Sequence, residues 1–213
     1  MDILHLKTPF SLLFCKFEKI IYMKYSIILI QAVLLFSCTS KEEGKKEKYL
    51  NYSTPLTQLM KESNLQKKDL YVEISKSQYT LFVKHDSEII KSYPVVLGPD
   101  PVNDKLQEGD GCTPEGIFKI RDKYPHRKWC RFIWLNYPND DSWKKHRKAK
   151  AEGKIPENAS IGGEVGIHGV PAGHDDWIEK GENWTLGCIS LKNADVVEIY
   201  DIMEKDTRIL IHK

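Results

Sequence analysis

One cysteine of the chain lies in a setting that suits nucleophilic chemistry. Cys188 follows Gly187 in the run W-T-L-G-C-I-S-L, residues 184–191. A glycine at this place lets the backbone turn sharply and bare its N–H groups, as stabilisation of an oxyanion requires. A free thiol is mostly protonated at neutral pH, so the reaction also needs a base. His168, in the run I-H-G, is the first candidate and would hold the thiolate as an ion pair; His174 is the second.

Residue types alone leave other interpretations open. A Cys and a His this far apart in sequence are equally compatible with a buried structural pair. A zinc site made of His168, His174 and Cys188 would lack the paired spacing that zinc ligands usually show, so we predict no metal. Cys112 and Cys130 could form a disulfide in an oxidising compartment or remain two separate thiols.

Short strands must position these side chains. From residue 70 onward, apolar residues alternate with polar ones, a pattern typical of half-buried strands. We expect strands at 70–74, 79–83, 89–97, 117–120, 131–137, 165–168, 188–191 and 208–212. Helices are expected at 55–64, at 143–152 with its N-cap among 140–142, and after Asn193 as the N-cap of a last helix. A long loop fills 98–116. The pattern predicts a mainly β domain with short helices, of the α+β class.

The N-terminus has the layout of an export signal. Lys24 precedes the apolar run I-I-L-I-Q-A-V-L-L-F, which is too short for a permanent membrane span. The following L-F-S-C resembles a bacterial lipoprotein box, in which the chain is cut before Cys38 and that cysteine is lipidated; a plain signal peptide or anchor is the alternative. Met23 is the expected true start. We therefore divide the chain into a leader at 1–37, a tether with a short helix at 38–69, and a domain at 70–213.

Charge excludes one class of partner. The chain has 32 basic and 30 acidic residues, a net charge of +2, which argues against nucleic acid. Between residues 119 and 154 there are 12 basic and 4 acidic residues. This local excess is interpreted as a solvated face, or as a surface that attracts an anionic wall polymer.

Two separated motifs resemble one known family. I-H-G at 167–169, followed by T-L-G-C-I-S-L-K-N-A-D at 185–195, is similar to the pattern of the L,D-transpeptidase catalytic (YkuD-like) family. G-D at 109–110 and T-P-E-G at 113–116 match a second segment of that family, in the same order along the chain. The resemblance covers residues 70–213. It implies a β-sandwich or mixed-sheet domain with a catalytic cysteine cleft.

The resemblance also implies the chemistry. Cys188 would attack the carbonyl of an L,D-linked stem peptide of peptidoglycan and form a thioester. His168 would take the thiol proton, and the backbone carbonyl of Gly169 would orient the imidazole. The N–H groups of Leu186, Gly187 and Cys188 would face the oxyanion. No metal or organic cofactor is required.

Further residues follow from the same comparison. Thr185, Trp184 and His174 are the expected substrate contacts. Leu186 stands where many members have His or Lys, and Ser190 stands where Arg is common. An arginine there could bind a carboxylate through two hydrogen bonds, which a serine cannot do. The reaction class is therefore better defined by the sequence than the choice of donor or acceptor peptide.

Three functions remain in competition. The first is an L,D-transpeptidase that makes 3→3 cross-links or attaches proteins to the wall, with roles in peptidoglycan biosynthesis and cell shape. The second is an L,D-carboxypeptidase or endopeptidase that hydrolyses stem peptides or wall-protein links. The third is an inactive peptidoglycan-binding module. In each case we expect an exported monomer, lipid-anchored in the envelope and facing the periplasm or the cell surface.

Overall fold

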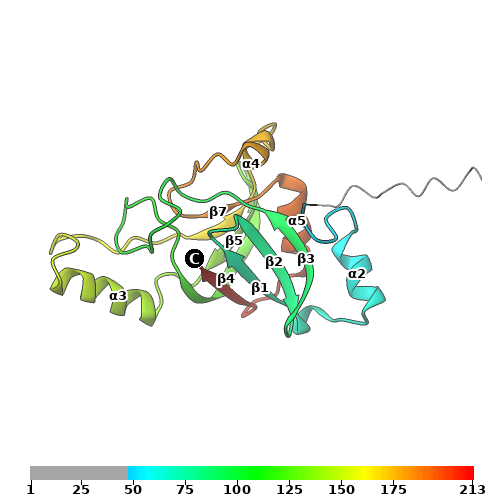
Figure 1. The fold of residues 1–213 in the computed structure, drawn as a ribbon, viewed down its shortest axis with the longest axis horizontal. Coiled ribbons are helices and arrows are strands. Elements are labelled where there is room, and N and C mark those ends of the chain that lie inside the picture. The colour runs from blue at the N-terminus through cyan, green and yellow to red at the C-terminus, as the bar shows by residue number, and fades with distance from the viewer. Residues whose placement is uncertain (1–47) are drawn as a thin grey trace, which may run out of the picture. The chain divides into compact units, whose positions relative to one another are not determined.

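Alternating apolar residues build the first half of the sheet. The computed structural model describes residues 48–213. β1 (Tyr71–Ser75), β2 (Thr80–His85) and β3 (Glu88–Pro94) form an antiparallel meander, and β8 (Arg208–His212) runs parallel to β1. Val72 and Ile74 on β1 are fully buried, as the period of two requires. The strands β1, β2 and β3 are labelled near the centre of Figure 1.

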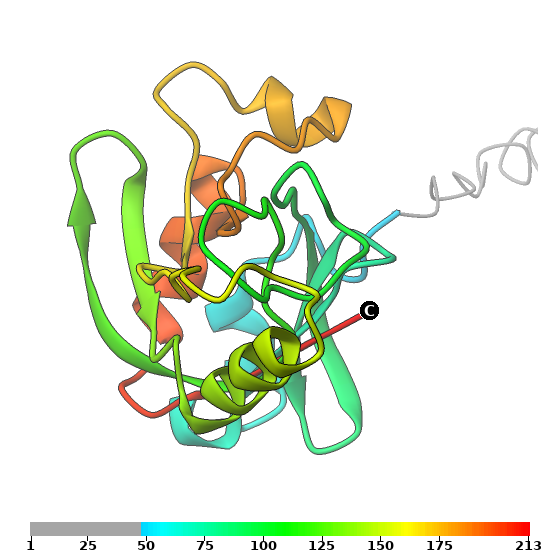
Figure 2. The same ribbon diagram turned by 90° about the vertical axis from the view of Figure 1, so that its left-hand side faces the viewer.

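A long fourth strand joins this half to the part that carries the site. β4 (Gly116–His126) pairs with β8 through its first residues and with β5 (Cys130–Leu135) through its later ones. The register shifts between Ile120 and Asp122, a bulge that bends the strand. β6 (Gly166–His168) and β7 (Ile189–Ser190) complete the eight strands described, in the order β3-β2-β1-β8-β4-β5-β6-β7. The hairpin of β4 and β5 extends along the left of Figure 2.

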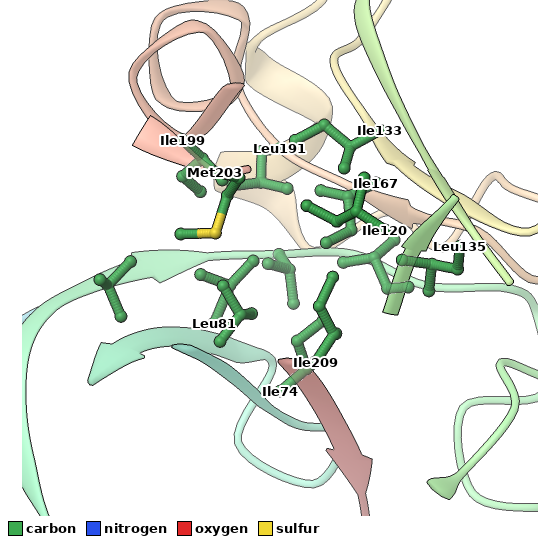
Figure 3. Close-up of a cluster of buried hydrophobic side chains, with 14 of the residues drawn as sticks. Ile74, Leu81, Ile120, Ile133, Leu135, Ile167, Leu191, Ile199, Met203 and Ile209 are labelled. Carbon is green, nitrogen blue, oxygen red and sulfur yellow. The ribbon is translucent and has the colours of Figure 1, made fainter. Parts of the chain in front are cut away.

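The core lies between the two halves of the bent sheet. Ile74, Leu81 and Ile209 approach it from the first half, and Ile133 and Ile167 from the second (Figure 3). α5 (Asn193–Ile202) closes the core, and α2 (Leu56–Glu62) packs its buried side against the same cluster. The other helical segments within residues 48–213 are η1 (Lys67–Asp69), α3 (Asp140–Ala151) and α4 (Asp176–Lys180). The structure confirms the α+β class and the mixed sheet.

A buried lysine holds the long loop between β3 and β4 in place. Lys76 lies in the turn after β1 and is 1% exposed. Its Nζ donates to the carbonyl oxygens of Asn103 (2.6 Å) and Thr113 (3.1 Å) and to Glu115 Oε1 (2.9 Å). Because a buried ammonium needs such partners, both ends of the loop are tied to the sheet.

Several sequence predictions differ from the structure at their boundaries. Asn139, not a residue of 140–142, caps α3, because its Oδ1 accepts the N–H of Ser142 at 3.0 Å. Asn193 is the first residue of α5 rather than its cap, and its N–H donates to Asp175 Oδ1 at 2.8 Å. β4 continues six residues beyond the predicted end at Ile120, and α4 was not predicted.

The leader, Cys38 and the start of the tether lie outside the described residues. The later part of the predicted tether, from residue 50, packs on the domain: Leu56 is fully buried, and Leu50 N–H donates to Ser92 Oγ at 2.7 Å. Within residues 48–213, no helix combines the length and apolarity that crossing a membrane would need.

Candidate functional site

Two neighbouring strand ends bring Cys188 and His168 together. β6 and β7 are parallel, with Ile167 opposite Ile189 and His168 opposite Ser190. Cys188 immediately precedes β7, so it falls two positions from the partner of His168, on the same face of the sheet. Diagonal neighbours of this kind lie about 7–8 Å apart, a separation that aromatic and long side chains can bridge. Both residues line one cavity of about 760 Å³.

The cavity has one aromatic wall. Its rings come from β4, β5, the turn between them and the loop before β7: Tyr124, His126, Trp129, Phe132, Trp134 and Trp184. Most of the remaining lining comes from the loops at 105–109, 162–165 and 185–188. A site with apolar walls and a few polar groups suits a peptide substrate whose reacting bond must be shielded from water.

The imidazole of His168 is buried and held in one tautomer. Its Nδ1 lies 2.7 Å from the carbonyl oxygen of Gly169, which can only accept, so Nδ1 carries the proton and Nε2 is free to act as a base. The ring packs against Trp129 and Trp184, with centroids 4.7 Å and 5.4 Å away. Burial lowers the pKa of His168 to about 4, although the Gly169 carbonyl opposes the shift.

The thiol of Cys188 lies within hydrogen-bond distance of a backbone carbonyl. Its Sγ donates to the carbonyl oxygen of Glu164 at 3.6 Å. Burial raises the pKa of Cys188 to about 11; a hydrogen bond from the Gly166 backbone and the charge of Lys105 lower it in part, and Glu164 raises it further. Both shifts favour a thiol beside a neutral imidazole over the ion pair that the sequence predicts. Proton transfer to His168 must accompany attack on the substrate.

Gly187 gives the turn before Cys188 its shape. Its φ is +128°, and a Cβ at this position would lie 2.5 Å from the carbonyl oxygen of Cys112. The N–H of Gly187 donates to Thr185 Oγ1 at 3.2 Å, and that hydroxyl donates to the Cys188 carbonyl at 2.7 Å. Along the described chain, the N–H groups of Leu186 and Cys188 have no partner. Two amides, rather than the three predicted, thus remain for an oxyanion.

The other predicted contacts divide into two groups. Trp184, Thr185 and Leu186 line the cavity, and the Leu186 side chain is 84% exposed at its edge. His174 does not line it: the residue is exposed, and its ring packs on Trp177 with centroids 4.3 Å apart. The loop after β6 carries His174 away from the site, which spacing along the sequence could not reveal.

Ser190 lies in the protein interior, beside the carbonyl that orients His168. Ser190 is fully buried, and its Oγ donates to the Gly169 carbonyl at 3.4 Å.

Cys112 and Cys130 are both free thiols, so the disulfide alternative is wrong for this structure. Among residues 48–213, no group of three or more His, Cys, Asp or Glu side chains has an arrangement that could hold a metal ion.

Two basic residues of the cavity were not predicted from the sequence. Lys105 is buried in the loop before β4, and His126 ends β4. His126 Nδ1 accepts the N–H groups of Lys128 (3.3 Å) and Trp129 (3.1 Å), so its proton lies on Nε2. The G-D motif at 109–110 was the available signal for Lys105, because Asp110 is its ion-pair partner. No local pattern distinguished His126.

One family model and several solved structures are similar to this chain. The family model described as L,D-transpeptidase catalytic domain matches residues 69–211. Similar solved structures include the helical cell shape determining protein Pgp2 from Campylobacter jejuni (20% identity, 74% of this chain, 55% of that chain, TM-score 0.49). Another is Bd1075 from Bdellovibrio bacteriovorus (22% identity, 68% of this chain, 48% of that chain, TM-score 0.46). A third is an L,D-transpeptidase from Mycobacterium smegmatis (14% identity, 68% of this chain, 59% of that chain, TM-score 0.44). The chain spans about half the length of each. The comparison with curated proteins finds no match.

Proposed function

Because the chain belongs to the L,D-transpeptidase catalytic domain family, we propose that it is a cysteine acyltransferase acting on stem peptides of peptidoglycan. The observation that carries the proposal is the meeting of Cys188 and His168 in one cavity, with Gly169 fixing the imidazole tautomer. This is the nucleophile, base and orienting group that thiol acyl transfer requires.

The first half-reaction forms a thioester. As the Cys188 sulfur attacks the donor carbonyl, its proton passes to His168 Nε2, and the carbonyl oxygen becomes negative against the Leu186 and Cys188 N–H groups. The C–N bond then breaks, and the proton on His168 moves to the departing amine of the terminal D-amino acid. Since burial disfavours the imidazolium, His168 gives this proton up readily.

The second half-reaction resolves the thioester. An amine of a second stem peptide attacks the acyl carbon, loses a proton to His168, and displaces the Cys188 sulfur, which recovers that proton. The product is a 3→3 cross-link or an attached protein. Water in place of the amine gives hydrolysis, the runner-up function.

Product analysis separates these functions. A defined tetrapeptide donor is incubated with the protein, with and without an acceptor peptide, and products are identified by mass spectrometry. Transfer predicts a cross-linked product that needs the acceptor. Shortened donor alone, in both mixtures, would contradict transfer and support the hydrolase; binding without any turnover would support the inactive module. Cys188→Ala is the control that must abolish every product.

We also propose that the protein is a lipid-anchored monomer of the cell envelope. The support is the sequence L-F-S-C before residue 39 and the polar run that follows it. Expression of the full chain and of Cys38→Ser in a bacterial host tests the anchor. The unchanged chain should fractionate with membranes and incorporate labelled fatty acid. Equal labelling of the Cys38→Ser variant would contradict it.

A further inference from the structure

Lys105 is a buried cation in the wall of the cavity. Its side chain is only 4% exposed, and it is the one lysine or arginine among the described residues that line the cavity. A buried ammonium is costly unless it is paired, so its position needs an explanation beyond solubility.

The loop around Asp110 is built to hold this ammonium. Asp110 Oδ1 accepts from Lys105 Nζ at 2.8 Å and from the Cys112 N–H at 3.0 Å, and Oδ2 accepts the N–H groups of Leu106 (2.8 Å) and Gln107 (3.0 Å). Burial opposes ionisation of Asp110, but these hydrogen bonds hold its pKa below the usual value. Asp110 uses one of the three ammonium donors, and no other acceptor within residues 48–213 engages the remaining two.

The ammonium is next to the turn that precedes Cys188. A Cβ built on Gly187 would lie 3.6 Å from Lys105 Nζ. This turn also carries the unpaired N–H groups of Leu186 and Cys188, while the Gly187 N–H is used by Thr185. The Gly187 N–H is thus unavailable to an oxyanion, and the positive charge of Lys105 lies beside the same turn.

We propose that Lys105 is a further catalytic group, which donates a charge-assisted hydrogen bond to the oxygen that becomes negative when Cys188 attacks a peptide carbonyl. The inference rests on the proposed function and adds a residue to it. Charge-assisted hydrogen bonds are roughly twice as strong as neutral ones, and their strength grows where water is excluded. Lys105 thus replaces the amide donor that Gly187 gives to Thr185.

Four other groups of the cavity that can change charge do not substitute for Lys105. Glu164 raises the pKa of Cys188, and Glu108 lies exposed at the rim. His168 is neutral at pH 7, since its pKa is about 4, and Tyr124 remains protonated because burial raises its pKa. Lys105 also acts on the thiol, whose pKa it lowers against the larger effect of burial.

Replacement of Lys105 tests the proposal on two donor peptides. Lys105→Met keeps the length of the side chain and removes its charge, whereas Lys105→Arg keeps the charge. The donors are a tetrapeptide with a free C-terminal carboxylate and the same peptide as an amide. We expect Lys105→Met to lower kcat about 100-fold on both donors, as loss of an oxyanion donor does, with partial rescue in Lys105→Arg. Lys144→Met, on exposed α3, is the matched control with unchanged kcat.

Two results would overturn the assignment. A loss confined to KM and to the acid donor would make Lys105 a receptor for the substrate carboxylate instead. Unchanged kcat on both donors would remove it from the reaction. If Lys105→Met folds poorly because Asp110 loses its ion-pair partner, the double variant Lys105→Met/Asp110→Asn removes both charges. The same measurements are then made on the double variant.

A second readout separates this inference from the proposed function. The rate of Cys188 alkylation by iodoacetamide against pH reports the thiol pKa without any peptide turnover. Lys105→Met should shift that profile to higher pH, and Lys144→Met should not. No shift would contradict the placement of the charge beside the thiol. If the unmodified protein alkylates normally but processes neither peptide, the proposed function fails while the placement of Lys105 stands.

Discussion

The two halves of the sheet are specified in different ways. In the half built from β1, β2, β3 and β8, alternating apolar side chains fix which face is buried, and Val72 and Ile74 are both fully buried. In the half that ends in β6 and β7, the decisive contacts belong to the backbone: the Gly169 carbonyl on His168, and the close approach of Gly187 to Cys112. Stability therefore depends mainly on side-chain packing, whereas the proposed activity depends on backbone placement. The two can be perturbed separately.

The largest effect on stability should come from the packed half. Ile74→Ala removes a fully buried side chain and leaves a cavity, so we expect a loss of roughly 2–5 kcal/mol in the free energy of unfolding. Urea unfolding measures it. Ile117→Ala is the matched control, because Ile117 is 58% exposed and should cost well under 1 kcal/mol. Equal losses for the two variants would contradict the placement of the core.

The pH dependence of stability contrasts two buried groups. Burial lowers the pKa of His168 to about 4, so its contribution to the free energy of unfolding is lost as pH falls from 6.5 to 4. Asp195 on α5 accepts a hydrogen bond from the Tyr52 hydroxyl at 2.8 Å, and burial raises its pKa to about 6. Its contribution to the free energy of unfolding is therefore lost as pH rises from 3.8 to 6. Each effect is at most about 3 kcal/mol, and they offset each other in the unmodified protein.

Single replacements should reveal each group. Asp195→Asn should make stability rise with pH between 4 and 6.5, and His168→Gln should make it fall over the same range. Urea unfolding at half-unit pH steps measures both. Parallel profiles in the two variants would mean that burial does not set these pKa values.

The next effect concerns the backbone of the site. Gly187→Ala forces a side chain onto a φ of +128° and against the Cys112 carbonyl, with a strain of roughly 1–3 kcal/mol. Because the turn positions the Cys188 thiol and the N–H groups of Leu186 and Cys188, we expect kcat to fall about 100-fold even in the folded protein. Gly173→Ala is the control: it also has a positive φ, but a Cβ there meets open space. Unchanged turnover in Gly187→Ala would show that the turn tolerates movement.

Ser190→Ala should have the smallest effect. It removes a long hydrogen bond of 3.4 Å to the Gly169 carbonyl, which still accepts from His168. The expected cost is about 1 kcal/mol in stability, with kcat lowered only a few-fold. Thermal unfolding and turnover assays measure both. A loss comparable to that of Gly187→Ala would give Ser190 a direct part in holding the imidazole.

Periodic patterns made most of the fold predictable. The strands around Ile74, Leu81 and Ile209 follow from alternation, and the last strand has its predicted bounds. The extension of β4 to His126 was missed because this part of the hairpin is polar and largely exposed, so it shows no alternation. α4 was missed because five residues give too little of a helical period.

The site was predictable only where a motif named its residues. Cys188, His168 and Gly169 were found through H-G and G-C, and the structure brings them together. His174 was chosen by proximity in sequence and lies elsewhere. Lys105 reaches the site through a loop closed by Asp110, which joins segments far apart along the chain. Such long-range placement leaves no mark on local composition.

Covalent trapping of Cys188 tests the central claim most directly. The purified domain is exposed to a carbapenem or to the tetrapeptide donor, and its intact mass is measured, followed by peptide mapping. The account predicts one acyl adduct on the peptide that contains Cys188, absent from a folded Cys188→Ala variant. An adduct that persists in Cys188→Ala, or that maps to Cys112 or Cys130, would contradict the assignment of the nucleophile.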